Sequence, residues 1–598
     1  MVGHYTPSLI SPGRTMLDFV RLLMKRYQSI LQHTRPSAPI NALSKANLSS
    51  LHLSEAFLEK AQFLELHPKL PIQIVVVGPT QVGKSSLVNL LLGHDYAKVS
   101  PLAGFTTYPQ GFAYGMEEAD LSKVEQFFPG YRRIIRDHES DHQEKRFALT
   151  PVSASRHQDF GSCVIWDTPD FDSIHAADYH NSLLRTIAFA DVIVLAVSKD
   201  KYADQSVWQL LDLIEPLNQP TLVFLNKISS EQSPLVIRSI AEKWRASRKA
   251  SPPAIISAPF LKQGLASYQS TAEFNQLPTQ LKKAIGEVRR AQIHRQCDVI
   301  LEYFWSNWTD AVREEHNLRA DWNSLVEVAG NGAIEIYERY YLNHPQHFDT
   351  LKRALAELLT LLEIPGIAPL LTRTRSLLTW PVRAVFGLGN YDSKTSDSRA
   401  RTSQESKVLE RMYEHYRIQL SNIVLSKRAE GVEQDYWWSE ISSLLNSEDG
   451  AFYETYHQAV RIYQSDFQHE IEEAAHHLYN KLEQQPATLN SLRATRVTTD
   501  AAAVAIALKT GGIGVQDFMI TPAVLSLTSF LTESALGHYM RRVEAELKQK
   551  QLSAVAKQVF DGAINQRMKN LPDRMTPNNK FNIPEASLRE ADAQLHAI

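Results

Sequence analysis

The sequence predicts an α/β domain with a mainly parallel sheet, followed by a large α-helical domain. Apolar, β-branched runs alternate with helix-like segments from residue 70 to about residue 290. This alternation is typical of a parallel sheet whose strands are joined by helices. After about residue 290 the apolar spacing changes to the period of amphipathic helices. The chain has 598 residues, too many for one core, so we expect two to four domains.

The first predicted elements are helices over residues 1–69, with a polar break at 33–39. The α/β domain follows at 70–290, and its predicted strands are Ile72–Val77, Gly161–Trp166, Asp191–Val197, Thr221–Leu225 and Ala254–Ile256. An insertion rich in charge and histidine lies at 131–157, for which we expect a solvated loop. Metal binding through His138, His142 and His157 is the alternative for this segment.

The helical domain is predicted at 291–567, with a flexible polar loop at 391–406 and a loose tail at 568–598. Its strongest signal is a run of apolar residues spaced by three or four, which lines one face of a helix. The run is Tyr456, Val460, Tyr463, Phe467, Ile471, Ala474, Leu478 and Leu482. Leu536, Met540, Val543 and Leu547 repeat this spacing. Nearby His457, His469, His476 and His477 are expected to face solvent.

Composition limits the partners. The apolar content of 43% is that of a folded soluble protein, and the net charge of −3 gives no general attraction to nucleic acid.

The two cysteines, Cys163 and Cys297, form no close-spaced metal pattern and no disulfide framework, which indicates a reducing, cytoplasmic compartment. We expect no signal peptide. The longest uncharged run, 518–532, is 15 residues long, short of the roughly 20 that span a bilayer.

The most specific motif is a phosphate-binding P-loop, Gly-x4-Gly-Lys-Ser, at Gly78–Ser85. It follows an apolar strand and opens a helix, which makes a chance match improbable. Its glycines let backbone N–H groups approach phosphate oxygens, and Lys84 brings a positive charge to the terminal phosphates. The residues predicted to bind phosphate are Gly78, Thr80, Gln81, Val82, Gly83, Lys84, Ser85 and Ser86.

Four further motifs follow the P-loop in order. They are Gly-Phe-Thr-Thr-Tyr at 104–108, Trp-Asp-Thr-Pro-Asp at 166–170, Asn-Lys-Ile-Ser at 226–229 and Ile-Ser-Ala at 256–258. With the P-loop, they resemble the P-loop GTPases, nearest the Era/TrmE-like group and the dynamin-like proteins. The resemblance covers about residues 70–290.

This resemblance implies GTP and Mg²⁺ as ligands. The metal ligands would be Ser85, Asp167 and a switch threonine, Thr107, with Thr106 as the alternative. Asp170 stands where the family has a glycine that contacts the γ-phosphate. Because a carboxylate repels phosphate, Asp170 must point away, pair with a cation or be protonated.

The base site would consist of Asn226, Lys227, Ser229, Ser257 and Ala258. Ser229 replaces the family's aspartate and cannot make its two charged hydrogen bonds to guanine, which would cost roughly 1.5–3 kcal/mol of discrimination. Glu231 is an alternative acid if the loop shifts. We assign no catalytic base, because Phe171 occupies the position of the family's catalytic glutamine. Potassium recruitment, which some relatives achieve through an asparagine at the position of Gln81, stays open.

Two segments outside the α/β domain have membrane-like character. Residues 364–391 combine basic and aromatic side chains without an acid, the character of a membrane interface. The candidates there are Arg373, Arg375, Trp380, Arg383 and Phe386. Residues 501–536 contain two short apolar stretches around glycines, which suit a re-entrant hairpin. For both segments the alternative is ordinary packing within the helical domain.

The sequence thus predicts a GTP-binding protein, an Mg²⁺-dependent GTPase that couples its nucleotide state to a helical effector domain. A dynamin-like role at the inner face of a membrane, with lipid or a partner protein bound, is the associated expectation, and so is a nucleotide-dependent dimer. The alternatives are a slow or inactive GTPase that acts as a binding module, and a ribosome-associated GTPase. No basic RNA-binding module accompanies the last alternative.

Overall fold

The structure of the chain is a computed structural model. It describes residues 12–33, 39–100, 106–134, 145–152, 161–172, 176–248, 251–259, 272–344, 350–362, 404–430, 435–490, 492, 527–534, 536–576 and 580–596. The chain forms two compact units, one of residues 1–315 with 580–598 and the other of residues 316–579. This division differs from the expected one, because the N-terminal helices and residues 580–598 of the expected tail both join the α/β domain.

A single mixed sheet forms the centre of the first unit. Its strands, in the order β3-β4-β2-β5-β1-β6-β7-β8, pair in parallel except for β2 with β5. The bounds are β1 Ile72–Val77, β2 Gln110–Tyr114, β3 Arg132–Ile134, β4 Arg146–Val152, β5 Cys163–Asp167, β6 Val192–Ser198, β7 Thr221–Asn226 and β8 Ala254–Ser257. The mainly parallel sheet is therefore confirmed, and all five predicted strands are present.

Three strands were missed by the sequence prediction, namely β2, β3 and β4. Two of them, β3 and β4, lie within the insertion at 131–157, for which a loop was expected. Their sequences carry charged or small residues at several positions, so their apolar alternation is weak. Pairing decides their conformation instead, because β2 aligns with β5 and β4 aligns with β2.

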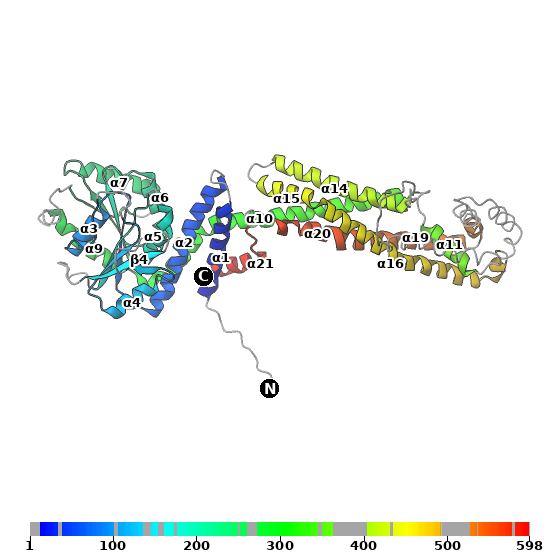
Figure 1. The fold of residues 1–598 in the computed structure, drawn as a ribbon, viewed down its shortest axis with the longest axis horizontal. Coiled ribbons are helices and arrows are strands. Elements are labelled where there is room, and N and C mark those ends of the chain that lie inside the picture. Colours follow the sequence, from blue (N-terminus) through cyan, green and yellow to red (C-terminus); the bar gives the residue numbers. More distant parts are fainter. Residues whose placement is uncertain are drawn as a thin grey trace, which may run out of the picture. The chain divides into compact units, whose positions relative to one another are not determined.

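Helices cover both faces of the sheet (Figure 1). Their bounds are α3 Lys84–Leu92, α4 Glu118–Gln126, α5 Ala176–Phe189, α6 Gln205–Ile214, η2 Glu215–Leu217, α7 Ser233–Ser247, α9 Ala272–Glu287 and η3 Arg290–Gln292. Side chains of β1 alternate between two cores, because successive residues of a strand face opposite ways. Ile74 and Val76 pack with α3 and α9, whereas Val75 and Val77 pack with α5 and α6.

A second helical layer belongs to the same unit. It contains α1 Pro12–His33, α2 Pro39–Leu66, the first part of α10 Ile293–Tyr337 and α21 Glu585–His596. Polar contacts fix this layer, since Tyr27 donates to the Trp308 carbonyl at 2.9 Å and Trp305 donates to Asp592 at 2.7 Å. The expectation of a loose tail at 568–598 is therefore wrong for α21, which is an ordered helix. Leu588 and Leu595 of α21 are buried in the core.

The second unit consists of helices. They are the rest of α10, η4 Glu338–Leu342, α11 Thr350–Leu361, α14 Gln404–Glu430, α15 Asp435–Ser447, α16 Asp449–Glu483, α19 Gly537–Ala554, η5 Val555–Asn565, α20 Gln566–Lys569 and η6 Leu571–Arg574. All eight apolar residues of the predicted face on α16 are buried, as are the four predicted on and just before α19. The predicted helical domain is confirmed. The loop expected at 391–406 lies outside the described residues up to 403, and α14 begins at Gln404.

Candidate functional site

The loop between β1 and α3 has the backbone geometry that a phosphate cradle needs. Gly83 adopts a φ of 92°, a left-handed conformation that favours glycine, and Gln81 is also left-handed at 62°. Gly78 is required for space, because a Cβ there would lie 2.3 Å from the carbonyl oxygen of Ala196. The loop between β1 and α3 can therefore direct its backbone N–H groups, and those at the start of α3, toward an anion.

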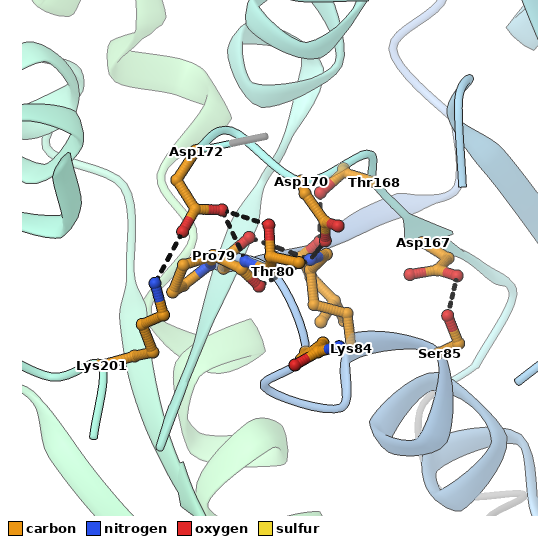
Figure 2. A network of polar contacts seen from close by, with 12 residues as sticks. Pro79, Thr80, Lys84, Ser85, Asp167, Thr168, Asp170, Asp172 and Lys201 are labelled. Carbon is orange, nitrogen blue, oxygen red and sulfur yellow. Dashed lines mark hydrogen bonds and ion pairs between the residues drawn. The ribbon is translucent and has the colours of Figure 1, made fainter. Parts of the chain in front are cut away.

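Lys84 is the buried cation of this loop. Its ammonium group donates to the carbonyl oxygens of Gly78 at 2.9 Å and Pro79 at 3.0 Å. It also forms an ion pair with the Asp170 carboxylate (Figure 2). The Lys84 and Asp170 side chains are only 5% and 11% exposed. Of the three alternatives for Asp170, the structure therefore shows pairing with a cation.

Asp172 makes a second contact from the same segment to the P-loop. The backbone N–H and the hydroxyl of Thr80 both donate to Asp172 Oδ1 at 2.6 Å. Lys201 contacts the other carboxylate oxygen at 3.2 Å (Figure 2). These contacts outweigh burial and lower the pKa of Asp172. Sequence reasoning missed Asp172 and Lys201, although acidic residues just beyond the end of β5 were the available signal.

Ser85 and Asp167 lie together at the start of α3 and the end of β5. The Ser85 hydroxyl donates to Asp167 Oδ2 at 2.7 Å (Figure 2). Asp167 is 1% exposed, and its other oxygen is buried without a hydrogen-bond partner. Burial raises the pKa of Asp167 to about 6, although Ser85 and Lys84 act in the opposite direction. A hydroxyl beside a carboxylate with an unused oxygen fits an oxygen-preferring cation such as Mg²⁺.

The candidate base-site residues lie at the ends of β7 and β8. Asn226 donates to the Val82 carbonyl at 2.8 Å, and Lys227 donates to the Gln81 carbonyl at 2.6 Å. The β7 and β8 ends are joined by backbone bonds from Ala258 to Leu225 and from Ile228 to Ala258. Ser229 is exposed and Ser257 is half-buried. The P-loop and the two strand ends therefore form one connected structure.

Comparison with known families identifies this structure. Residues 73–227 match the family described as 50S ribosome-binding GTPase. Residues 73–227 form a P-loop GTPase domain. The match contains the P-loop, both switch motifs and Asn226 and Lys227, which confirms the sequence prediction of a P-loop GTPase. A GTPase domain of this kind implies GTP binding, typically with Mg²⁺.

Solved structures also resemble the chain. An oligomerised bacterial dynamin pair, described as sensing and tethering membranes, is 12% identical, with 97% of this chain and 99% of that chain covered and a TM-score of 0.38. LeoA, a bacterial dynamin GTPase from ETEC, is 12% identical, with coverages of 97% and 98% and a TM-score of 0.22. Toc33 from Arabidopsis thaliana with GDP and Mg²⁺ is 17% identical, with coverages of 44% and 98% and a TM-score of 0.24. A comparison with curated proteins gave no match.

The first switch of the GTPase domain is described from Thr106 onward. Thr106 is buried and Thr107 is half-buried, both just before β2. The contacts of the described residues bring together Lys84, Ser85, Asp167 and Asp170, and they do not join Thr107 to this group. The role of Thr107 at the metal stays a prediction, as do the roles of the other site residues.

Several candidates outside the GTPase domain's site lie beyond the described residues. These are Arg373, Arg375, Trp380, Arg383, Phe386, the segment 501–526, and His138, His142 and His157. Among the residues that the structure does describe, no helix is long and apolar enough to cross a membrane. Within those same residues, no group of three or more His, Cys, Asp or Glu side chains could hold a metal ion.

Proposed function

We propose that this protein binds GTP with Mg²⁺, hydrolyses it, and uses the nucleotide state to control its helical unit. The observation that supports this proposal most directly is the grouping of Lys84, Ser85 and Asp167 at the opening of the P-loop. The match of residues 73–227 to a GTPase family supports the same reading. Lys84 and Ser85 lie where the P-loop meets α3, and Asp167 lies at the end of β5. Phosphoryl transfer requires a cation and metal ligands to be positioned together in this way.

The chain's residues divide the phosphoryl-transfer work between positioning and charge. The P-loop N–H groups hold phosphate oxygens, and Lys84 neutralises charge at the terminal phosphates. Ser85 and Asp167 would hold Mg²⁺, which would supply further positive charge to the phosphate oxygens. Asp167 must be ionised for this role, so metal binding competes with its proton. We assign no general base, since Phe171 occupies the position where the family's catalytic glutamine would stand.

Base recognition falls to Asn226 and Lys227, with Ser257 and Ala258 beside the base. Both Asn226 and Lys227 also hold P-loop carbonyls, at 2.8 and 2.6 Å. Ser229 offers a neutral hydroxyl where an aspartate would select guanine. We therefore propose that phosphate contacts provide most of the affinity and that guanine selectivity is weak.

Coupling to the helices is proposed to run through a buried ion cluster at the other end of the sheet. Asp191, just before β6, accepts the backbone N–H of Gln73 in β1 at 2.9 Å. The same carboxylate pairs with Lys60 of α2 and Arg290 of η3. Strand β1 leads into the P-loop, and α10 begins directly after η3. A movement of the sheet on nucleotide binding would therefore be transmitted through this cluster to α2 and α10. Helix α10 contributes residues to both units.

The first test is nucleotide binding and turnover by the purified chain with Mg²⁺. We expect GTP to bind and phosphate to be released. Lys84→Ala should weaken nucleotide binding at least about 100-fold, because it removes a charge-assisted contact to phosphate. Lys69→Ala, which removes an exposed lysine, is the matched control. Ser85→Ala is a second variant that should lose the Mg²⁺ dependence. A wild-type chain that binds no GTP would refute the proposal.

A binding module with little turnover is the second candidate function. The ion pair between Asp170 and Lys84 favours this second candidate, because the lysine that would stabilise the transferred phosphate is already paired with a carboxylate. The same assays separate the two functions, since this candidate predicts tight binding with phosphate release no faster than the Lys84→Ala variant. Co-sedimentation with anionic vesicles or with ribosomes, with and without a non-hydrolysable GTP analogue, then tests the membrane and ribosome alternatives. Light scattering with the same analogue tests a nucleotide-dependent dimer.

A further inference from the structure

All three donors of the Lys84 ammonium group are used within the protein in this structure. An ammonium offers three N–H donors, and here they meet three acceptors: the carbonyls of Gly78 and Pro79 and the carboxylate of Asp170. The two carbonyls belong to the P-loop itself and shape it. Asp170 belongs to the second switch, so it is the partner that a γ-phosphate would replace.

Asp170 is held in this position by more than its ion pair. Its carbonyl oxygen accepts the hydroxyl of Tyr179 in α5 at 2.9 Å. Two residues further on, Asp172 accepts both donors of Thr80 at 2.6 Å and is itself paired with Lys201. The switch segment therefore contacts the P-loop at two points, each through a carboxylate (Figure 2).

We propose that Asp170 determines whether this site accepts a nucleoside diphosphate or a nucleoside triphosphate. This inference rests on the proposed function, nucleotide binding at the P-loop. A P-loop lysine reaches the terminal phosphates of a bound nucleotide. A γ-phosphate brings further negative charge to an ammonium that already carries a carboxylate, and two anions so close repel each other. A diphosphate lacks this group, and its β-phosphate can reach Lys84 by replacing a loop carbonyl, which leaves the Asp170–Lys84 pair in place.

Triphosphate binding accordingly requires Asp170 to leave Lys84. Asp172 lies only two residues beyond Asp170, so displacement of Asp170 also strains the contacts between Asp172 and Thr80. The GDP form keeps the switch segment clamped on the P-loop, and the GTP form releases it. Asp170 thus acts as an internal anion that competes with the γ-phosphate.

The test compares GDP with a non-hydrolysable GTP analogue on the full chain with Mg²⁺, by calorimetry or fluorescent nucleotides. We expect the wild type to bind GDP at least about 10-fold more tightly than the analogue, the size of one charge-assisted contact. Asp170→Asn keeps the shape and removes the charge. It should raise affinity for the analogue about 10-fold and leave GDP affinity within about 3-fold.

Asp170→Gly is a second variant, in case the amide disturbs the buried lysine, and should shift the ratio in the same direction. Asp200→Asn, which neutralises an exposed acid in the turn after β6, should leave the ratio unchanged. Equal affinities in the wild type, or equal changes for both nucleotides in the Asp170 variants, would overturn the inference while GTP binding stands. A wild type that binds neither nucleotide would overturn the proposed function and this inference together.

Discussion

The Lys60 ammonium lies 3.1 Å from Asp191 Oδ1, and both side chains are almost completely buried. Arg290 pairs with the other oxygen of the same carboxylate, and the Gln73 N–H donates to it as well. The cluster joins α2, β1 and the segment that begins α10. Removing one member of a buried ion cluster leaves an uncompensated charge, which typically costs 3–5 kcal/mol.

Asp191→Ala should therefore lower the free energy of unfolding by about 3 kcal/mol, measured by denaturant titration of the whole chain. Asp310→Asn, which affects an exposed ion pair with Arg313, should change it by less than about 0.5 kcal/mol. Because Lys60 and Arg290 outweigh burial and lower the pKa of Asp191, its contribution should be present at neutral pH and lost as pH falls below about 4. A loss no greater than that of Asp310→Asn would contradict this account.

Asp167 should behave in the opposite way with pH. Burial raises its pKa to about 6, above the value of 3.8 for an unperturbed carboxyl, so the folded chain holds this proton more strongly than the unfolded chain. Its contribution to stability is present at low pH and is lost as pH rises through about 6. In the metal-free protein, Asp167→Asn should raise the free energy of unfolding at pH 7.5 by about 2 kcal/mol, since the amide oxygen still accepts from Ser85.

The same substitution should abolish Mg²⁺ stabilisation, and wild-type Mg²⁺ affinity should fall as pH drops below about 6. Thermal unfolding with and without Mg²⁺ and GDP, recorded from pH 5 to pH 8, measures both effects. Glu117→Gln, an exposed acid just before α4, is the control and should leave both unchanged. If Asp167→Asn destabilised the metal-free protein at pH 7.5, the raised pKa would be refuted.

Ser229→Asp should restore guanine selection. An aspartate at this position would accept two charge-assisted hydrogen bonds from guanine and none of this kind from adenine. We expect the preference for GTP over ATP to increase about 10- to 100-fold, measured by competition against a fluorescent guanine nucleotide. Ser230→Asp places the same charge one residue further along an exposed loop and is the matched control. An equal effect of both variants would show that charge alone, and not recognition of the base, is responsible.

The C-terminal helix should be part of the first unit's stability. Leu588 of α21 is 3% exposed within the core that also contains Tyr27 and Trp305. Leu588→Ala should lower the free energy of unfolding by about 2–4 kcal/mol, because it leaves a cavity. Leu66→Ala, at a leucine that is 77% exposed, should change it by less than about 0.5 kcal/mol. A result for Leu588→Ala as small as this control would restore the expectation of a loose tail.

Local patterns predicted much of this molecule. The P-loop and β1 were predicted at their observed positions, and the face of α16 was predicted residue by residue. These features depend on interactions within a few residues, such as the periodicity of a helix or the backbone needs of a tight loop. Strands β2, β3 and β4 were missed because their conformation depends on partners far along the chain. The helix α21 was missed because its apolar residues are few, and packing against α1 and α10 makes them part of a core.

The sequence by itself determined that the chain carries a P-loop followed by GTPase motifs, and that an acid, Asp170, replaces a glycine near the phosphates. It left three possibilities open for that acid, because none of them depends on local sequence. Only the tertiary structure decided between them, by bringing the end of β5 to the start of α3 so that Asp170 pairs with Lys84 and Asp172 holds Thr80. The physical reason is that a buried carboxylate and a buried ammonium are each costly alone, and the fold places them within reach of each other.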